Sequence, residues 1–177
     1  MPWRHNTSCR IISMALPDAE QLCRALAESI RPGLHPDTAL VGIHTGGVWV
    51  AERLHATLGL KTPLGSIDVA FYRDDFNRSG LHPQLKKSDI PFDVEDRPIV
   101  IVDDVLYTGR TIRAAMNEIF DYGRPARIDL AVLVDRGGRE LPVCPRWSAH
   151  ELALPPAQNL QLERSGAGIL TLRLIDA

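Results

Sequence analysis

Two adjacent carboxylates, Asp103 and Asp104, stand at the point where a run of apolar residues ends. The β-branched residues at positions 99–102 predict a strand that is buried on both faces. Buried carboxylates without partners are costly, so the hydroxyls of a diol or a shared divalent cation would explain them better. A ribose bound together with Mg²⁺ supplies both.

A short turn with hydroxyl side chains follows the two carboxylates. Gly109 permits a positive φ or a close approach of the backbone to a ligand, and Thr108 and Thr111 add hydroxyl donors. Arg110 adds a positive charge, and apolar residues recur at helical spacing after this turn. The N-terminus of a helix directs backbone N–H groups toward an anion. We therefore predict that this strand, turn and helix bind a phosphorylated ribose.

Other interpretations of the same residues were weighed. Taken singly, the aspartate pair could begin an exposed loop, and the threonine-rich turn could cap a helix. Their occurrence in one strand-turn-helix unit favours the phosphoribosyl site. The sequence has no Gly-x-x-x-x-Gly-Lys-Ser/Thr motif for a nucleoside triphosphate and no Gly-x-Gly-x-x-Gly motif for a dinucleotide. An aspartyl-phosphate enzyme is disfavoured because adjacent strand residues point to opposite faces.

Predicted strands and helices alternate along the chain. The spacing of apolar residues predicts helices at 16–30, 48–58 and 111–122, and strands at 38–44, 64–72, 99–103 and 127–135. The residues expected on the inward helix faces are Leu16, Ala19, Leu22, Cys23, Leu26, Ala27 and Ile30; Val48, Ala51, Leu54, His55 and Leu58; and Ile112, Ala115, Met116, Ile119 and Phe120. This order indicates a mostly parallel sheet with helices on its faces, where ligands bind beyond the carboxyl ends of the strands.

The same rule selects a loop after the first predicted strand. Thr45, Gly46 and Gly47 join that strand to its helix, and the two glycines free the backbone for close contact with an anion. A simple helix-capping turn is the alternative. His44 is expected to be a structural residue at the end of the strand.

Three later segments complete the expected site. Residues 134–136 end the last predicted strand and would face the base, with a surface turn as the alternative. Residues 73–92 have few apolar side chains, and a loop of this length is usually functional or disordered. We expect a lid there over a water-sensitive intermediate, with a merely solvated insertion as the alternative. Short apolar alternations at 152–154, 160–162 and 169–174 predict short strands that cover the base.

Composition limits the class of protein. The chain has 177 residues, 45% of them hydrophobic, and no Gly/Ser-rich linker, so we expect one domain over residues 1–177. Cys9, Cys23 and Cys144 lack the paired spacing of a zinc site or a disulfide framework, and reduced thiols are expected. Residues 1–6 contain no apolar segment, and no run of eighteen apolar residues occurs, which predicts a cytoplasmic protein without a membrane partner.

Residues 103–111 resemble the 5-phosphoribosyl 1-pyrophosphate (PRPP) motif of type I phosphoribosyltransferases. The longer pattern resembles the PyrR family, whose members are uracil phosphoribosyltransferases and regulators of pyrimidine operons. The resemblance extends from about residue 40 to residue 143 through Val41-Gly42-Ile43, Ile67-Asp68-Val69, Tyr72-Arg73-Asp74-Asp75, Leu133-Val134-Asp135-Arg136-Gly137 and Arg139-Glu140-Leu141-Pro142. It implies an α/β type I phosphoribosyltransferase fold: a central, mostly parallel sheet flanked by helices, with a small β-rich hood.

The resemblance also implies roles for residues. Asp103 and Asp104 would be catalytic and bind the ribose hydroxyls, Thr45-Gly46-Gly47 would be the pyrophosphate loop, and Arg73 would belong to the lid. Gly46 stands where the family usually has arginine. The residues implied in PRPP binding are Val105, Leu106, Tyr107, Thr108, Gly109, Arg110 and Thr111; those implied in base binding are Val134, Asp135 and Arg136. Arg136 is expected to approach pyrophosphate or a base carbonyl.

The implied reaction converts uracil and PRPP to UMP and pyrophosphate. Mg²⁺ would bind chiefly through the pyrophosphate and the ribose diol, with no protein cage and with Asp103 and Asp104 as the protein groups that could share it. No covalent nucleophile is required. A homo-oligomer, dimer or tetramer, is expected.

Two alternative functions remain open. The first is regulation by binding a messenger RNA leader, for which Arg136, Arg139 and Arg146 could form a basic patch. A net charge of −2, Gly138 in place of the family's usual histidine, and Glu151 in a segment that is more basic in the family predict weak or absent RNA binding. The second alternative is a purine (hypoxanthine or guanine) phosphoribosyltransferase.

Overall fold

The computed structural model describes residues 15–69 and 87–176. Its elements in chain order are α1 (Ala19–Ile30), the 3-10 turn η1 (Arg31–Gly33), β1 (Ala39–Ile43), α2 (Gly46–Leu58), β2 (Gly65–Ile67), β3 (Pro98–Leu106), α3 (Arg110–Tyr122), β4 (Arg127–Asp135), β5 (Trp147–Glu151), β6 (Gln158–Arg164) and β7 (Leu170–Asp176). Among the described helices, none is long and apolar enough to cross a bilayer.

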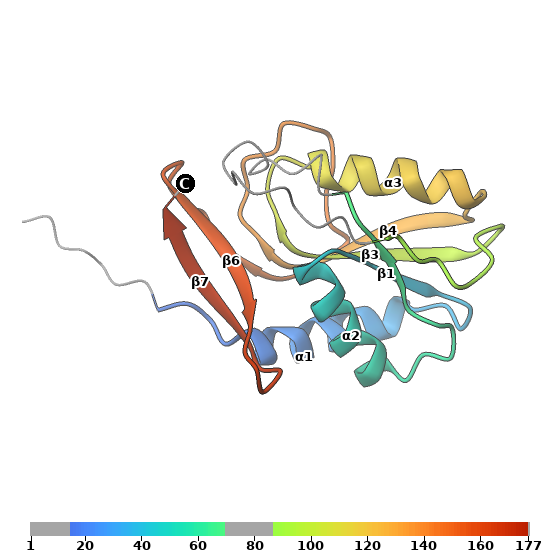
Figure 1. Ribbon diagram of the computed structural model, residues 1–177, viewed down its shortest axis with the longest axis horizontal. Coiled ribbons are helices and arrows are strands. Elements are labelled where there is room, and N and C mark those ends of the chain that lie inside the picture. Colours follow the sequence, from blue (N-terminus) through green and yellow to red (C-terminus); the bar gives the residue numbers. More distant parts are fainter. Residues whose placement is uncertain (1–14, 70–86, 177) are drawn as a thin grey trace, which may run out of the picture.

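Five strands form a parallel sheet in the order β2-β1-β3-β4-β5. The last two strands, β6 and β7, pair with each other as an antiparallel hairpin. In Figure 1, α1 and α2 lie on one side of the sheet, α3 lies on the other, and the β6-β7 hairpin stands beyond one end. The expected parallel α/β sheet is confirmed, and the hairpin corresponds to the expected hood.

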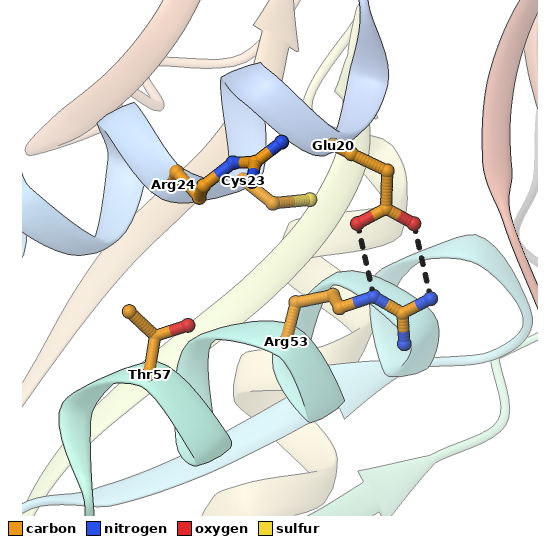
Figure 2. Close-up of a pocket in the computed structure, with 5 residues that line it drawn as sticks. All are labelled: Glu20, Cys23, Arg24, Arg53 and Thr57. Carbon is orange, nitrogen blue, oxygen red and sulfur yellow. Dashed lines mark hydrogen bonds and ion pairs between the residues drawn. The ribbon is translucent and has the colours of Figure 1, made fainter.

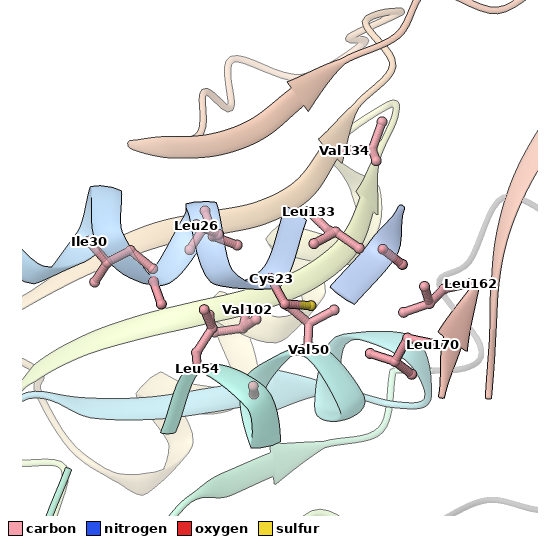
Figure 3. Close-up of a cluster of buried hydrophobic side chains, with 14 of the residues drawn as sticks. Cys23, Leu26, Ile30, Val50, Leu54, Val102, Leu133, Val134, Leu162 and Leu170 are labelled. Atoms are coloured by element: carbon pink, nitrogen blue, oxygen red, sulfur yellow. The ribbon is translucent and has the colours of Figure 1, made fainter. Parts of the chain in front are cut away.

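Two apolar clusters fill the spaces on either side of the sheet. Val100 and Val102 of β3 pack into the cluster with α1 and α2, part of which is drawn in Figure 3. Ile99 and Ile101 of the same strand pack into the cluster with α3. This alternation within a strand buried on both faces is what the period-two geometry of a strand requires.

The helices begin at different residues from those predicted. α1 begins at Ala19, and Asp18 is its N-cap residue. The Asp18 carboxylate accepts a hydrogen bond from Gln21 N–H at 2.9 Å. α2 begins at Gly46, two residues early, so the glycine pair forms its first turn.

The residues predicted on the inward faces of α2 and α3 also differ from those observed. The inward face of α2 continues from Gly47 to Val50, Ala51 and Leu54, at helical spacing, while Val48, His55 and Leu58 are only partly buried. α3 begins at Arg110, and Phe120 is 56% exposed because it lies beside the stripe made by Ile112, Ala115 and Ile119.

The strands differ from the prediction at three places. β3 continues through Leu106, three residues past Asp103. β5 was not predicted, because only two of its five residues, Trp147 and Ala149, are apolar, which is too short an alternation to mark a strand. Its pairing with β4 holds it in the sheet. Residues 152–154 are not a strand, and β2 occupies only 65–67 of the predicted 64–72, of which residues 70–72 lie outside the described part.

An ion pair joins both helices of one sheet face to the hairpin. Arg53 of α2 donates two hydrogen bonds to the Glu20 carboxylate of α1, both at 3.1 Å, as Figure 2 shows. Arg53 also donates to Gly168 O at 2.5 Å, in the turn between β6 and β7. Leu170 N–H donates to Glu20 at 3.0 Å. The pKa of Glu20 lies below its ordinary value, chiefly because of the hydrogen bond from Arg53.

Candidate functional site

Both carboxylates predicted to be catalytic lie within β3 beside the first turn of α2. A Cβ on Gly46 would overlap the Asp104 carboxylate, and a Cβ on Gly47 would lie 3.1 Å from Asp103 Oδ1. In a regular strand, side chains three residues apart point to opposite faces of the sheet. Here Val102 and Val105 both pack against the α1 and α2 cluster, so the alternation of faces is interrupted between them. This break brings two neighbouring carboxylates to the same helix N-terminus.

The predicted pyrophosphate loop is the first turn of a helix rather than a free loop. Gly42 and Gly47 let this turn approach the sheet, since Cβ atoms there would lie 2.6 Å from Val48 Cα and 2.5 Å from Val102 O. Thr45 is the N-cap residue but makes no side-chain hydrogen bond to the first turn. The peptide bond before Thr45 is cis, and His44 N–H donates to Ile67 O at 2.8 Å, as expected of a strand-end residue.

The segment after β3, residues 107–111, has the backbone that a phosphate loop requires. Gly109 has φ +94°, so the predicted positive φ is confirmed. The first intrahelical hydrogen bond of α3 runs from Arg113 N–H to Gly109 O at 3.0 Å. The N–H groups of Arg110, Thr111 and Ile112 precede that bond, as in the first turn of any α-helix. The Arg110 side chain forms an ion pair with Glu140.

Three consecutive carbonyls at this point face the loop between β4 and β5. The hydrogen bonds are from Arg136 N to Leu106 O at 3.1 Å, from Arg139 Nη1 to Tyr107 O at 2.8 Å, and from Glu140 N and Leu141 N to Thr108 O at 3.0 and 3.1 Å. Because the peptide bonds are trans, the N–H group of each following residue points the opposite way. The N–H groups of residues 107–109 therefore point away from that loop, an arrangement suited to an anion.

The Arg136 side chain contacts the β6-β7 hairpin. Its side chain is only 7% exposed and donates to Asn159 Oδ1 at 2.7 Å and Gln158 O at 3.1 Å, both in β6. Its guanidinium also lies 3.9 Å from the centre of the Tyr107 ring. Burial and two hydrogen bonds direct the Arg136 guanidinium to the hairpin in this structure. Its approach to pyrophosphate or a base carbonyl stays a prediction.

The other residues predicted to bind the base offer mainly backbone groups. Val134 is fully buried in the core. Burial acts to raise the pKa of Asp135, but hydrogen bonds from Arg139 and from Gly137 N–H outweigh it, and this pKa lies below its ordinary value. Gly138 has φ +73°, and a Cβ there would overlap the Tyr107 ring. The ring occupies the space beside the position where the family usually has histidine.

The three arginines proposed for an RNA patch do not form one. Arg136 is buried, and Arg139 donates to the carbonyl of Tyr107, the residue that follows the carboxyl end of β3. Arg146 precedes β5, pairs with Asp129 and stacks on Trp147 at 4.6 Å. Since β4 and β5 are parallel, Arg146 lies at the amino ends of these strands, whereas Arg136 and Arg139 lie at the carboxyl ends. Intramolecular contacts occupy all three side chains.

The described residues form no enclosed metal site of their own. Within residues 15–69 and 87–176, no group of three or more His, Cys, Asp or Glu side chains is arranged to hold a metal ion. Asp103 and Asp104 are a pair of adjacent carboxylates that fits a metal shared with a substrate. The hollow of about 420 Å³ in Figure 2 lies between α1 and α2 and takes no residue from the carboxyl ends of the strands. Arg73, the predicted lid residue, lies outside the described part.

Sequence reasoning missed two contributions to this site. It gave Arg139 to an RNA patch, although the guanidinium lies behind the phosphate loop. It also missed Asn159, whose side-chain oxygen accepts a hydrogen bond from the buried Arg136. Neither contact joins residues that are close in sequence, and no local pattern marks them.

Comparison with known proteins first shows the class of protein to which the chain belongs. The family model of the phosphoribosyl transferase domain matches residues 14–148, which contain strands β1 to β4 of the sheet, the start of β5, the helices α1 to α3 and both carboxylates. A solved purine phosphoribosyltransferase from Pyrococcus horikoshii is similar at 31% identity with a TM-score of 0.56, covering 75% of this chain and 82% of that one. The fold is that of a type I phosphoribosyltransferase.

Sequence relatives narrow the class to a family. A bifunctional protein PyrR from Pseudomonas savastanoi is 47% identical over 167 residues, covering 92% of this chain and 97% of the relative. Another, from Nitrosococcus oceani, is 59% identical over 126 residues, covering 70% and 71%. The chain belongs to the PyrR family of type I phosphoribosyltransferases.

Proposed function

We propose that this protein is a uracil phosphoribosyltransferase, which transfers the phosphoribosyl group of PRPP to N1 of uracil and releases UMP and pyrophosphate. The observation that carries the proposal is the placement of Asp103 and Asp104 beside the first turn of α2, immediately before the phosphate loop. A ribose bound at the carboxylates would have its 5′-phosphate at residues 107–111 and its pyrophosphate at the first turn of α2.

In this mechanism the two carboxylates accept hydrogen bonds from the ribose hydroxyls. Loss of pyrophosphate leaves positive charge on the sugar, and two nearby negative charges stabilise it. The phosphate loop holds the other end of the sugar, so that C1 stays in line between the leaving group and uracil N1. Mg²⁺ bound with PRPP would neutralise charge on the pyrophosphate; Asp103 and Asp104 are the protein groups that fit it.

Backbone donors take the place of a cationic side chain at the pyrophosphate. Residue 46 is glycine, and the Asp104 carboxylate fills the space where a larger side chain would begin. The N–H groups of the first turn of α2 and the helix dipole remain available for the anion. Backbone groups of Val134, Asp135 and Arg136 would contact the base under the β6-β7 hairpin.

Release of pyrophosphate in the presence of PRPP and Mg²⁺ tests the proposal, with uracil, hypoxanthine and guanine as competing acceptors. We expect turnover with uracil and formation of UMP. The purine alternative deserves the direct comparison because a similar solved protein is described as a purine enzyme. Preference for hypoxanthine or guanine would replace the uracil assignment, while no turnover with any base would contradict transferase activity.

A second function, RNA-dependent regulation, is favoured by the word "bifunctional" in the names of the relatives. We propose that RNA binding by this chain is weak or absent, because its three candidate arginines are occupied internally. A homo-oligomer, one domain over residues 1–177 and a cytoplasmic location stay predictions from the sequence.

A further inference from the structure

The phosphate loop is supported from behind by one side chain. Its carbonyls at Leu106 and Thr108 accept hydrogen bonds from backbone N–H groups, which residues of any type supply. The carbonyl between them, Tyr107 O, accepts from Arg139 Nη1 at 2.8 Å. Support of this middle carbonyl therefore depends on the identity of residue 139.

The Arg139 guanidinium is held in a fixed orientation. Its Nε donates to Val143 O at 3.1 Å, and its Nη2 donates to Asp135 Oδ2 at 2.5 Å. The side chains of Arg139 and Asp135 are 22% and 18% exposed, so solvent screens this ion pair only in part. The planar guanidinium suits such a set of fixed acceptors, which an ammonium group does not match.

We infer that Arg139 is a positioning residue, which sets the direction of the N–H groups of the phosphate loop by binding Tyr107 O. In a trans peptide, the carbonyl of Tyr107 and the N–H of Thr108 point to opposite sides. Fixing the first toward Arg139 aims the second at the bound phosphate. This inference rests on the proposed function and adds a residue that need not touch the substrate.

Arg139→Gln tests the inference, with Arg139→Lys as a second variant. Arg146→Gln is the matched control, because Arg146 is in the same connection, also pairs with an aspartate, and lies away from the site. Ribose 5-phosphate contains the group held by the phosphate loop, whereas pyrophosphate lacks it. Calorimetry with each of these two probes, in Mg²⁺, separates a local effect on the phosphate loop from general loss of structure.

We expect Arg139→Gln to weaken ribose 5-phosphate binding about tenfold, the factor equivalent to one charge-assisted hydrogen bond, and to leave pyrophosphate binding unchanged. Arg139→Lys should restore part of the affinity, and Arg146→Gln should match the wild type. Equal weakening of both probes, or wild-type affinity of Arg139→Gln for ribose 5-phosphate, would overturn the inference. Failure of the wild type to bind ribose 5-phosphate would instead contradict the proposed function.

Discussion

Asp103 and Asp104 are neighbours with different surroundings. Asp103 is 7% exposed, and its Oδ1 accepts a hydrogen bond from Asp104 N–H at 3.0 Å. Asp104 is less buried and lies against Gly46. Asparagine has nearly the same shape as aspartate, so the charge of either residue can be removed with little change of shape.

Replacing either aspartate by asparagine should slow catalysis while keeping the fold. We expect Asp103→Asn and Asp104→Asn each to raise the activation free energy by about 2 to 4 kcal/mol, because a negative charge opposite the cationic sugar is lost. Steady-state kinetics with urea unfolding measures both quantities. Asp129→Asn, in an ion pair with Arg146 away from the site, is the control. Unchanged kcat in both variants would refute the assigned roles.

Gly109 and Gly59 form a matched pair for the phosphate loop. Both have positive φ, +94° and +66°, but Gly59 ends α2 in open space whereas Val143 and Leu141 lie 3.3 and 3.4 Å from a Cβ at 109. Valine should introduce backbone strain of about 1 to 2 kcal/mol at either position. We expect Gly109→Val to abolish PRPP binding in calorimetry and Gly59→Val to keep it. Wild-type affinity in a folded Gly109→Val protein would disprove the phosphate-loop assignment.

At the scale of elements, one ionised group, the Glu20 carboxylate, contributes to holding the β6-β7 hairpin against α1 and α2. Glu20 accepts hydrogen bonds from both Arg53 and Leu170, and the hydrogen bond from Arg53 is the main reason that its pKa lies below 4.5. A carboxyl whose pKa is lowered on folding stabilises the folded state above its unfolded pKa. That contribution is lost as the pH falls through the folded pKa.

Glu20→Gln should therefore be less stable than the wild type at neutral pH, with a difference that shrinks at about pH 3. Urea unfolding at both pH values provides the measurement. Glu28→Gln removes a pair with Arg31 whose side chains are 67% and 48% exposed, and is expected to change stability little. A difference between wild type and Glu20→Gln that does not vary with pH would contradict this account.

The strands also show where sequence patterns predict structure correctly and where they do not. β4 was predicted with its observed bounds, because nine residues between clear turn signals leave little choice. β5 was missed because it has only two apolar residues, Trp147 and Ala149, which pack against the core while backbone hydrogen bonds to β4 hold the strand. The segment predicted to bind phosphate, residues 107–111, could be recognised as a pattern because its residues are contiguous, whereas the contact of Arg139 with Tyr107 O spans 32 positions.

For the whole molecule, charge is the property that bears on RNA. The net charge is −2, and the three arginines considered for a patch are divided between opposite edges of the sheet and occupied there. RNA binding requires several phosphate contacts made together. The distribution of charge in the described part of the chain supplies no such group from these residues.

We therefore expect micromolar or weaker affinity for a pyrimidine-leader RNA at physiological salt, with or without UMP. Filter binding measures it, and a scrambled RNA of equal length is the control. Nanomolar affinity that UMP increases would show the expectation to be wrong, and would mean that the nucleotide shifts the protein between two conformations.

The close contact of α2 with the sheet through Gly42, Gly46 and Gly47 affects how often the helix and the sheet separate. Without Cβ atoms between them, the first turn of the helix and strands β1 and β3 can separate only when the core opens. Hydrogen exchange of the hydrogen-bonded amides of β1, β3 and the later turns of α2 should accordingly be among the slowest in the chain. A ligand that arrives at this side of the site meets amides already in place, so that adjustment to it must come from other segments.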